Sequence, residues 1–150
     1  NQVATQARQT TFEENGDIIK GVKWLSTLDT RTSPICRARD GQVYGLQDGP
    51  RPPAHPNCRS VVTPIVKSAA ELGLRRREIA PGTRASMNGQ VPRDLTYEQW
   101  LKTQDTQAQN EALGVRRAQL WRAGRIPMDD MVTKDGRALT LAELEAIDQG

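Results

Sequence analysis

The feature that most constrains this chain is a group of four prolines, Pro50, Pro52, Pro53 and Pro56, in the segment GPRPPAHPNCR. Proline fixes φ and has no N–H to donate, so this segment cannot form a helix or a central strand. We expect a rigid loop that lies across other elements. The segment also contains Cys58, one of the chain's two cysteines, and its only histidine.

The residues around this loop show short apolar patterns. Residues 18–26 predict a strand, and residues 42–46 predict a second strand after a hairpin turn at Asp40-Gly41. Residues 60–66 predict a third strand, which Pro64 places at a sheet edge. Further on, TYEQ (96–99) and TLAE (140–143) are capping boxes that start helices, and residues 105–124 predict two helical pieces joined at Gly114 and ending at Gly124. We therefore predict an α+β fold with a small antiparallel sheet and a Pro-rich loop, followed by several short helices.

The chain divides into four predicted segments. Residues 1–16 are the end of an N-terminal helix, and residues 17–68 form a small β-rich unit with the Cys and His residues. Residues 69–95 are a basic, turn-rich linker or arm. Residues 96–150 form a helical C-terminal unit that packs as one domain with 17–68. Because the first residue is not Met, we expect a processed chain or part of a longer one.

Charge is distributed unevenly, although the net charge is only +3. Residues 31–93 carry eleven Lys or Arg and four Asp or Glu, whereas residues 126–150 carry two and six. Sixteen of the 21 basic residues are Arg, which favours bidentate contacts to phosphate or carboxylate. Arg75, Arg76 and Arg77 are candidate contacts to nucleic acid or to a partner. With only 36% hydrophobic residues the core is modest, so we expect neighbouring chains to complete the fold. No apolar run is long enough to span a membrane.

Cys36, His55 and Cys58 lie within 23 residues of one another. Thiolate and imidazole are the ligands that zinc prefers, and structural sites use four of them, so Asp29 or Asp40 is a candidate fourth ligand. Three interpretations stay open at this point: a zinc site, a Cys36–Cys58 disulfide, or two buried thiols beside a hydrogen-bonded histidine. A Cys–His nucleophilic pair is a weaker alternative, since nothing marks either cysteine as activated. Two cysteines do not form a disulfide scaffold, which favours a reducing compartment.

The order and spacing of KWLSTLDTRTSPICRARDG and PPAHPNCRS resemble the signature of the phage head-morphogenesis family, the Mu F-like minor head proteins, in its C-terminal portion. The segments TYEQWLKTQ, ALGVRRAQLWRAGRI and LTLAEL are similar to the later part of that family. Many members carry another Cys three positions before Cys36, where this chain has Ser33. The positions that carry the resemblance are Trp24, Asp29, Arg31, Thr32, Cys36, Asp40, Gly41, His55, Pro56, Asn57, Cys58 and Arg59.

The resemblance implies a structural minor head protein of a tailed phage, not an enzyme, that acts in head morphogenesis near the portal. The implied partners are portal, major capsid or scaffolding proteins and packaged DNA, with no membrane and no small-molecule substrate. The implied location is the virion (capsid interior or portal region), and the host cytoplasm during assembly. Zinc at Cys36, His55 and Cys58 is the candidate cofactor. The remaining motif residues have structural roles, with Asp29 and Arg59 expected as an ion pair or backbone clamp.

Two functions of other classes remain as alternatives. One is a metal-dependent enzyme acting on nucleic acid, with His55 as base or ligand. The other is a basic DNA-binding module that uses residues 31–93.

Overall fold

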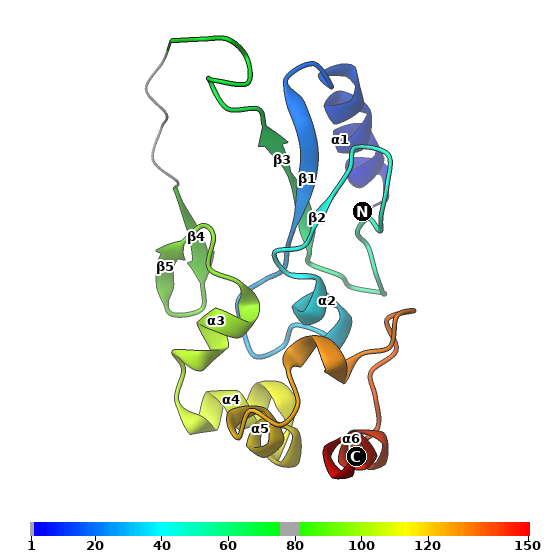
Figure 1. The fold of residues 1–150 in the computed structure, drawn as a ribbon, viewed down its shortest axis with the longest axis vertical. Helices are drawn as coiled ribbons and strands as arrows, with labels where there is room; N and C mark the ends of the chain where they lie inside the picture. Colours follow the sequence, from blue (N-terminus) through cyan, green and yellow to red (C-terminus); the bar gives the residue numbers. More distant parts are fainter. Residues whose placement is uncertain (1, 76–81) are drawn as a thin grey trace.

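The computed structural model describes residues 2–75 and 82–150 and is shown in Figure 1. Within these residues the chain forms six α-helices, one 3₁₀ helix and five strands, which confirms the α+β class. The elements in chain order are α1 (Gln2–Glu14), β1 (Ile19–Leu25), α2 (Pro34–Arg39), β2 (Val43–Tyr44), β3 (Val61–Val66), β4 (Thr83–Ser86), β5 (Gly89–Pro92), α3 (Tyr97–Lys102), α4 (Thr106–Leu113), α5 (Val115–Arg122), η1 (Met128–Met131) and α6 (Leu141–Gln149).

Three strands form an antiparallel sheet in the order β2-β1-β3, so β1 is central. In β3, Pro64 pairs opposite Val22, and Val62 pairs opposite Trp24. The predicted edge position of Pro64 is confirmed, because β3 has a neighbour on one side only among the described strands. Strands β4 and β5 form a separate hairpin.

The predicted hairpin turn at Asp40-Gly41 is wrong, because helix α2 lies between β1 and β2. Pro34 occupies the first turn of this helix, a position that suits its fixed φ. Gly41, with φ of +83°, follows the helix and redirects the chain. Its N–H donates to Trp24 O at 2.9 Å, so the turn still returns the chain alongside β1. The Asp-Gly pair correctly predicted a turn, but it did not predict that the turn follows a helix.

Residues 69–95, the predicted linker or arm, include a β-hairpin. Residues 76–81 lie outside the described residues, and residues 83–92 form the β4–β5 hairpin. This hairpin is docked onto the protein, since the side chain of Arg84 is only 8% exposed and pairs with Asp40. Residues 83–92 therefore contact the rest of the protein through Arg84. The division of the chain into four segments stays a prediction.

The buried apolar residues form two clusters. Figure 1 shows β1–β3 and α1 in the upper half, helices α3–α6 in the lower half, and α2 between them. We name the clusters the sheet core and the helical core. The sheet core consists of Phe12, Ile19, Val22, Trp24, Cys36, Cys58 and Val62. The helical core consists of Leu28, Tyr97, Trp100, Leu101, Leu113, Ala118, Leu120, Trp121, Ile126, Met128, Met131 and Leu144.

Both predicted capping boxes are confirmed. Thr96 and Gln99 exchange hydrogen bonds at the start of α3, and Thr140 and Glu143 do so at the start of α6. Gly114, with φ of +85°, joins α4 to α5 as predicted. The three tryptophans of the chain are all buried, one in the sheet core and two in the helical core.

Candidate metal centre

Helix α2 places Cys36 in the sheet core. Ser33 is the N-cap of this helix, but its side chain makes no capping hydrogen bond. Its Oγ lies instead 2.8 Å from His55 Nε2. A serine at an N-cap normally bonds a free backbone N–H of the first turn, so this hydroxyl has been diverted toward the histidine.

The Pro-rich loop brings His55 and Cys58 to the same place. Cys58 N donates to His55 O at 3.2 Å, and Asn57 between them has φ of 59°, so the loop forms a tight turn. Arg51 holds the start of the loop, because its guanidinium donates to the carbonyls of Gly45 and Leu46 at 2.7 and 2.9 Å. The turn and this clamp fix the loop against α2.

The three candidate ligands meet around a small space. Cys36 Sγ lies 3.3 Å from His55 Nε2 and 3.7 Å from Cys58 Sγ. All three ligand atoms lie within 4.8 Å of one another. Both cysteines are buried free thiols, so the disulfide interpretation does not describe this structure.

The ligand atoms fit a zinc ion. Zinc bound at about 2.3 Å from sulfur and about 2.0 Å from nitrogen has tetrahedral edges of about 3.8 Å between sulfurs and about 3.5 Å between sulfur and nitrogen. The observed 3.7 and 3.3 Å are close to these lengths. The third distance, between the ligand atoms of His55 and Cys58, is no more than 4.8 Å. Two of the three edges therefore match a tetrahedral zinc site.

The histidine tautomer also suits a metal. His55 Nδ1 lies 2.7 Å from Pro56 O, and a carbonyl oxygen can only accept, so Nδ1 carries the proton. Nε2 is then the unprotonated nitrogen, and it faces the two sulfurs. A backbone carbonyl that fixes the distal N–H in this way is the usual outer partner of a metal-binding histidine.

The two thiols differ in acidity. Burial raises the pKa of Cys36. Burial acts in the same direction on Cys58, but hydrogen bonds from the backbone of Ala54 and Ser60 outweigh it and lower the pKa of that thiol. Cys58 is therefore the more acidic of the two thiols, and the thiolate is the form that binds a metal.

Neither aspartate that we considered as a fourth ligand joins this group. Among the described residues, the group of potential ligands contains only Cys36, His55 and Cys58. Asp29 pairs with Arg59, whose two terminal nitrogens reach the two carboxylate oxygens at 2.5 and 3.0 Å. Burial raises the pKa of Asp29, but the bonds from Arg59, Thr32 and the Arg31 backbone outweigh it and lower the pKa.

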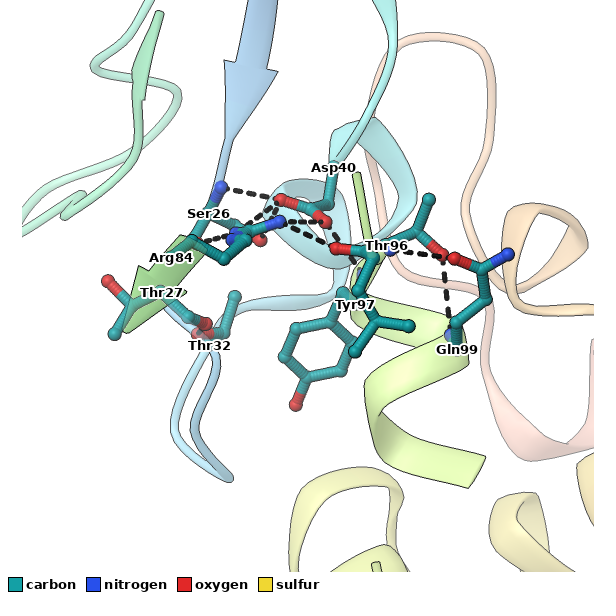
Figure 2. A network of polar contacts seen from close by, with 9 residues as sticks. Ser26, Thr27, Thr32, Asp40, Arg84, Thr96, Tyr97 and Gln99 are labelled. Carbon is teal, nitrogen blue, oxygen red and sulfur yellow. Dashed lines mark hydrogen bonds and ion pairs between the residues drawn. The ribbon is translucent and has the colours of Figure 1, made fainter. Parts of the chain in front are cut away.

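Asp40 lies at the centre of a buried polar network, which Figure 2 shows. Its side chain is 0% exposed and accepts from Ser26 N at 2.7 Å, from Tyr97 N at 2.6 Å and from both terminal nitrogens of Arg84 at 3.0 Å. These partners come from the end of β1, from β4 and from α3. Asp40 therefore joins the sheet to the helices and has no capacity left for a metal.

Of the other predicted site residues, some are buried and some are exposed. Trp24 is fully buried under Arg39, whose guanidinium carbon lies 5.3 Å from the ring centroid. Thr32 is buried and donates to Thr27 O at 2.5 Å, whereas Arg31 is exposed. Arg75 is exposed, and Arg76 and Arg77 lie outside the described residues.

Sequence reasoning missed Ser33 as a contact of the histidine, and it missed Arg51 and Arg84 as anchors. Ser33 was noted only as a departure from a cysteine pattern. Its position three residues before Cys36, one helical turn away, was the available signal. No local signal marked Arg84, because its partner is 44 residues distant.

Comparison with known proteins identifies one relationship. Residues 1–63 match the family described as Phage Mu protein F like protein, which confirms the resemblance over the part of the chain that contains the candidate metal ligands. The similarity proposed for the later helices lies outside this match and stays a prediction. No curated protein and no solved structure matches the chain. Of the described helices, none is long and apolar enough to cross a membrane.

Proposed function

We propose that this chain, whose residues 1–63 match the Phage Mu protein F like family, is a structural minor protein of a tailed-phage head that acts in head morphogenesis. The observation that carries the proposal is the family match over the motif-bearing part of the chain. The match indicates a phage head-morphogenesis protein. Location in the virion, attachment near the portal and contacts with capsid or scaffolding proteins are the finer parts of the proposal.

The contacts of the motif residues support a structural role. Asp29 pairs with Arg59 and so ties the segment after β1 to the end of the Pro-rich loop. Asp40 ties α2 to β4 and α3. The motif thus stabilises the places where separate segments of the chain cross, which is what a scaffold for protein contacts requires.

The basic segment gives little support to a DNA-binding module. Several of its arginines are used inside the protein: Arg37 donates to Ala112 O, Arg59 binds Asp29 and Arg84 binds Asp40. A surface that binds nucleic acid needs free cations to neutralise phosphates.

Acidic residues of the C-terminal segment 126–150 also form ion pairs within the protein. Arg116 and Arg125 pair with Glu145 and Asp148 of α6 at 3.0 and 2.9 Å. The uneven charge of the sequence is therefore partly an internal arrangement and not wholly a surface for a partner.

The structure also gives little support to the alternative of a metal-dependent nuclease. Such a site would need carboxylates beside His55 to hold the catalytic metal. The two candidates that the sequence suggested, Asp29 and Asp40, are both engaged by arginines. A second function is therefore not proposed.

We also propose zinc as the cofactor of the candidate metal centre. Two of the three distances between ligand atoms lie near tetrahedral spacing, and the His55 tautomer is the one that binds a metal. Zinc would hold the Pro-rich loop to α2 and supply binding free energy to a small core. Its role would be structural.

The test is the composition of purified heads. Mass spectrometry on proheads and on mature virions of the phage that encodes the chain should detect it in both, and crosslinking should connect it to portal, capsid or scaffolding protein. A matched pair of variants sharpens the test. Asp40→Asn, which breaks the buried network, should reduce incorporation and head assembly, whereas Glu145→Gln at an exposed pair should not. Absence of the protein from both particles would overturn the proposal.

A further inference from the structure

We propose that the metal centre binds zinc through three protein ligands only, and that the fourth coordination position is taken by an exchangeable water which Ser33 holds. This inference rests on the zinc binding proposed above. It concerns the geometry around Ser33, where the site has no strong fourth ligand.

Ser33 lies beside the ligand group, and its hydroxyl is a weaker zinc ligand than a thiolate or an imidazole. Its Oγ lies 2.8 Å from His55 Nε2, a hydrogen-bond distance. A zinc-bound oxygen and nitrogen would be about 3.3 Å apart in a tetrahedral site. Because His55 Nδ1 donates to Pro56 O, the Ser33 hydroxyl donates to Nε2. A metal at Nε2 would displace this hydrogen bond and free the hydroxyl for another partner.

A cavity beside the ligands provides room for a water. It has a volume of about 40 Å³ and is lined by Ser33, Cys36 and His55 together with Thr32 and Asn57. To hold one water, a cavity needs at least about 10–15 Å³ of water-accessible volume and two or more polar partners. The cavity meets both requirements, and the freed Ser33 hydroxyl supplies one of the partners.

The charge around the cavity favours exchange of that water for a small anion. Two thiolates balance the two charges of zinc, so the site itself is neutral. Arg31 and Arg59 both line the cavity. Arg59 is paired with Asp29, but Arg31 is exposed and contributes a positive charge beside the open position. A compact anion such as azide can then replace the water without a change in the protein ligands.

Cobalt(II) substitution with azide titration tests the proposal. The full chain is reduced, freed of metal and loaded with one cobalt(II), and its visible spectrum is recorded. We expect sulfur-to-cobalt absorption of two thiolates and d–d bands that shift when azide is added. Ser33→Cys should raise the absorption to the intensity of three thiolates and abolish the azide response. It should also tighten zinc binding by about 10- to 100-fold, the range that changes around a metal ligand set typically produce.

Ser33→Ala is the matched control, because it removes the hydroxyl and adds no ligand. It should keep the two-thiolate spectrum and an azide response, but the azide affinity should change, because the water that azide displaces has lost its hydrogen bond to Ser33. A wild-type spectrum that azide leaves unchanged would overturn the proposal, since the fourth position would then be filled by the protein. Failure of the reduced chain to bind cobalt or zinc would overturn it together with the zinc proposal. The head-protein proposal is tested separately, because incorporation into heads is measured without reference to metal.

Discussion

The helical core and the sheet core are stabilised by different means. The helical core contains Trp100, Tyr97 and Trp121, and most of its other members are aliphatic or Met residues. The sheet core is smaller, and two of its seven members are cysteines. Since small cores bury too little apolar area to be stable alone, the sheet core depends on other contacts. Two groups of contacts serve this purpose. One is the candidate metal centre within the sheet core, and the other is the Asp40 network that attaches the sheet core to the helical core.

Truncation of a tryptophan in the larger core should have the largest effect. Trp100 is 0% exposed and packs edge-to-face on Tyr97 with ring centroids 5.3 Å apart. Trp100→Ala should lower the free energy of unfolding by about 3–5 kcal/mol. Because the sheet core depends on the helical core, amide exchange should accelerate in β1 and β3 as well. Urea unfolding combined with hydrogen exchange measures both effects.

Trp100→Phe is the control for that experiment. The indole Nε1 has no hydrogen-bond partner among the described residues, so the smaller aromatic side chain loses packing only. We expect a loss of about 1–2 kcal/mol. Normal protection of β1 and β3 in Trp100→Ala would show that the two cores are independent.

Neutralising Asp40 should have the next largest effect. Asp40→Asn leaves the guanidinium of Arg84, 8% exposed, without its counter-charge. Breaking a buried pair from one side costs about 3 kcal/mol or more. The unfolding transition should also separate into two steps, because this network connects the cores. Calorimetry measures the transition, and Glu145→Gln, at an exposed pair, should change the unfolding free energy by less than about 0.5 kcal/mol.

Alkaline pH should weaken the contact between the two regions through Tyr97. Its hydroxyl donates to Asp29 O at 2.6 Å, and burial raises its pKa from an ordinary 10.0 to about 12, although Arg37 opposes the shift. A phenol whose folded pKa is raised contributes its full stability below pH 10 and loses it as the pH rises through 12. Two pH units correspond to about 2–3 kcal/mol.

Tyr97→Phe tests this assignment. It should cost about 1–2 kcal/mol at neutral pH, since the carbonyl of Asp29 loses its donor. It should also remove the part of the alkaline destabilisation between pH 10 and 12 that belongs to Tyr97. An unchanged pH profile in the variant would assign that loss to other groups.

The smallest effect should come from the start of α6. Thr140→Ala removes one half of the capping box and should cost about 1 kcal/mol, confined to the helical region. Bonds from Arg137 and Thr140 lower the pKa of Glu143 from 4.5 to about 2. The contribution of this carboxylate is complete above pH 4.5 and is lost as the pH falls through 2. Acid titration of helicity by circular dichroism should show a smaller loss in this range for Glu143→Gln.

The sequence predicted features that depend on neighbouring residues. Both capping boxes, the glycine joint at Gly114 and the edge strand with Pro64 are set by residues a few positions apart, and all were predicted correctly. Helix α2 was missed because the Asp-Gly pair that follows it is equally typical of a hairpin. A local signal can mark a turn without specifying what precedes it.

The candidate site was less predictable because its partners come from distant parts of the chain. The sequence identified Cys36, His55 and Cys58 as a group, and the structure brings them together. Asp40 was considered as a metal ligand, but its carboxylate accepts hydrogen bonds from Arg84, Ser26 and Tyr97 instead. Charge and spacing alone could not assign it, since the cost of burying a carboxylate depends on which donors the fold supplies.

The Asp40 network has a consequence for the order in which the protein is made. Its donors come from residues 26, 84 and 97. While the ribosome has released the chain only as far as residue 80, β1 and α2 have emerged with the carboxylate but without its guanidinium. The sheet region therefore cannot reach its final packing until β4 and the start of α3 have left the exit tunnel. Nascent chains should become resistant to protease late, after residue 97 has emerged, and in one step.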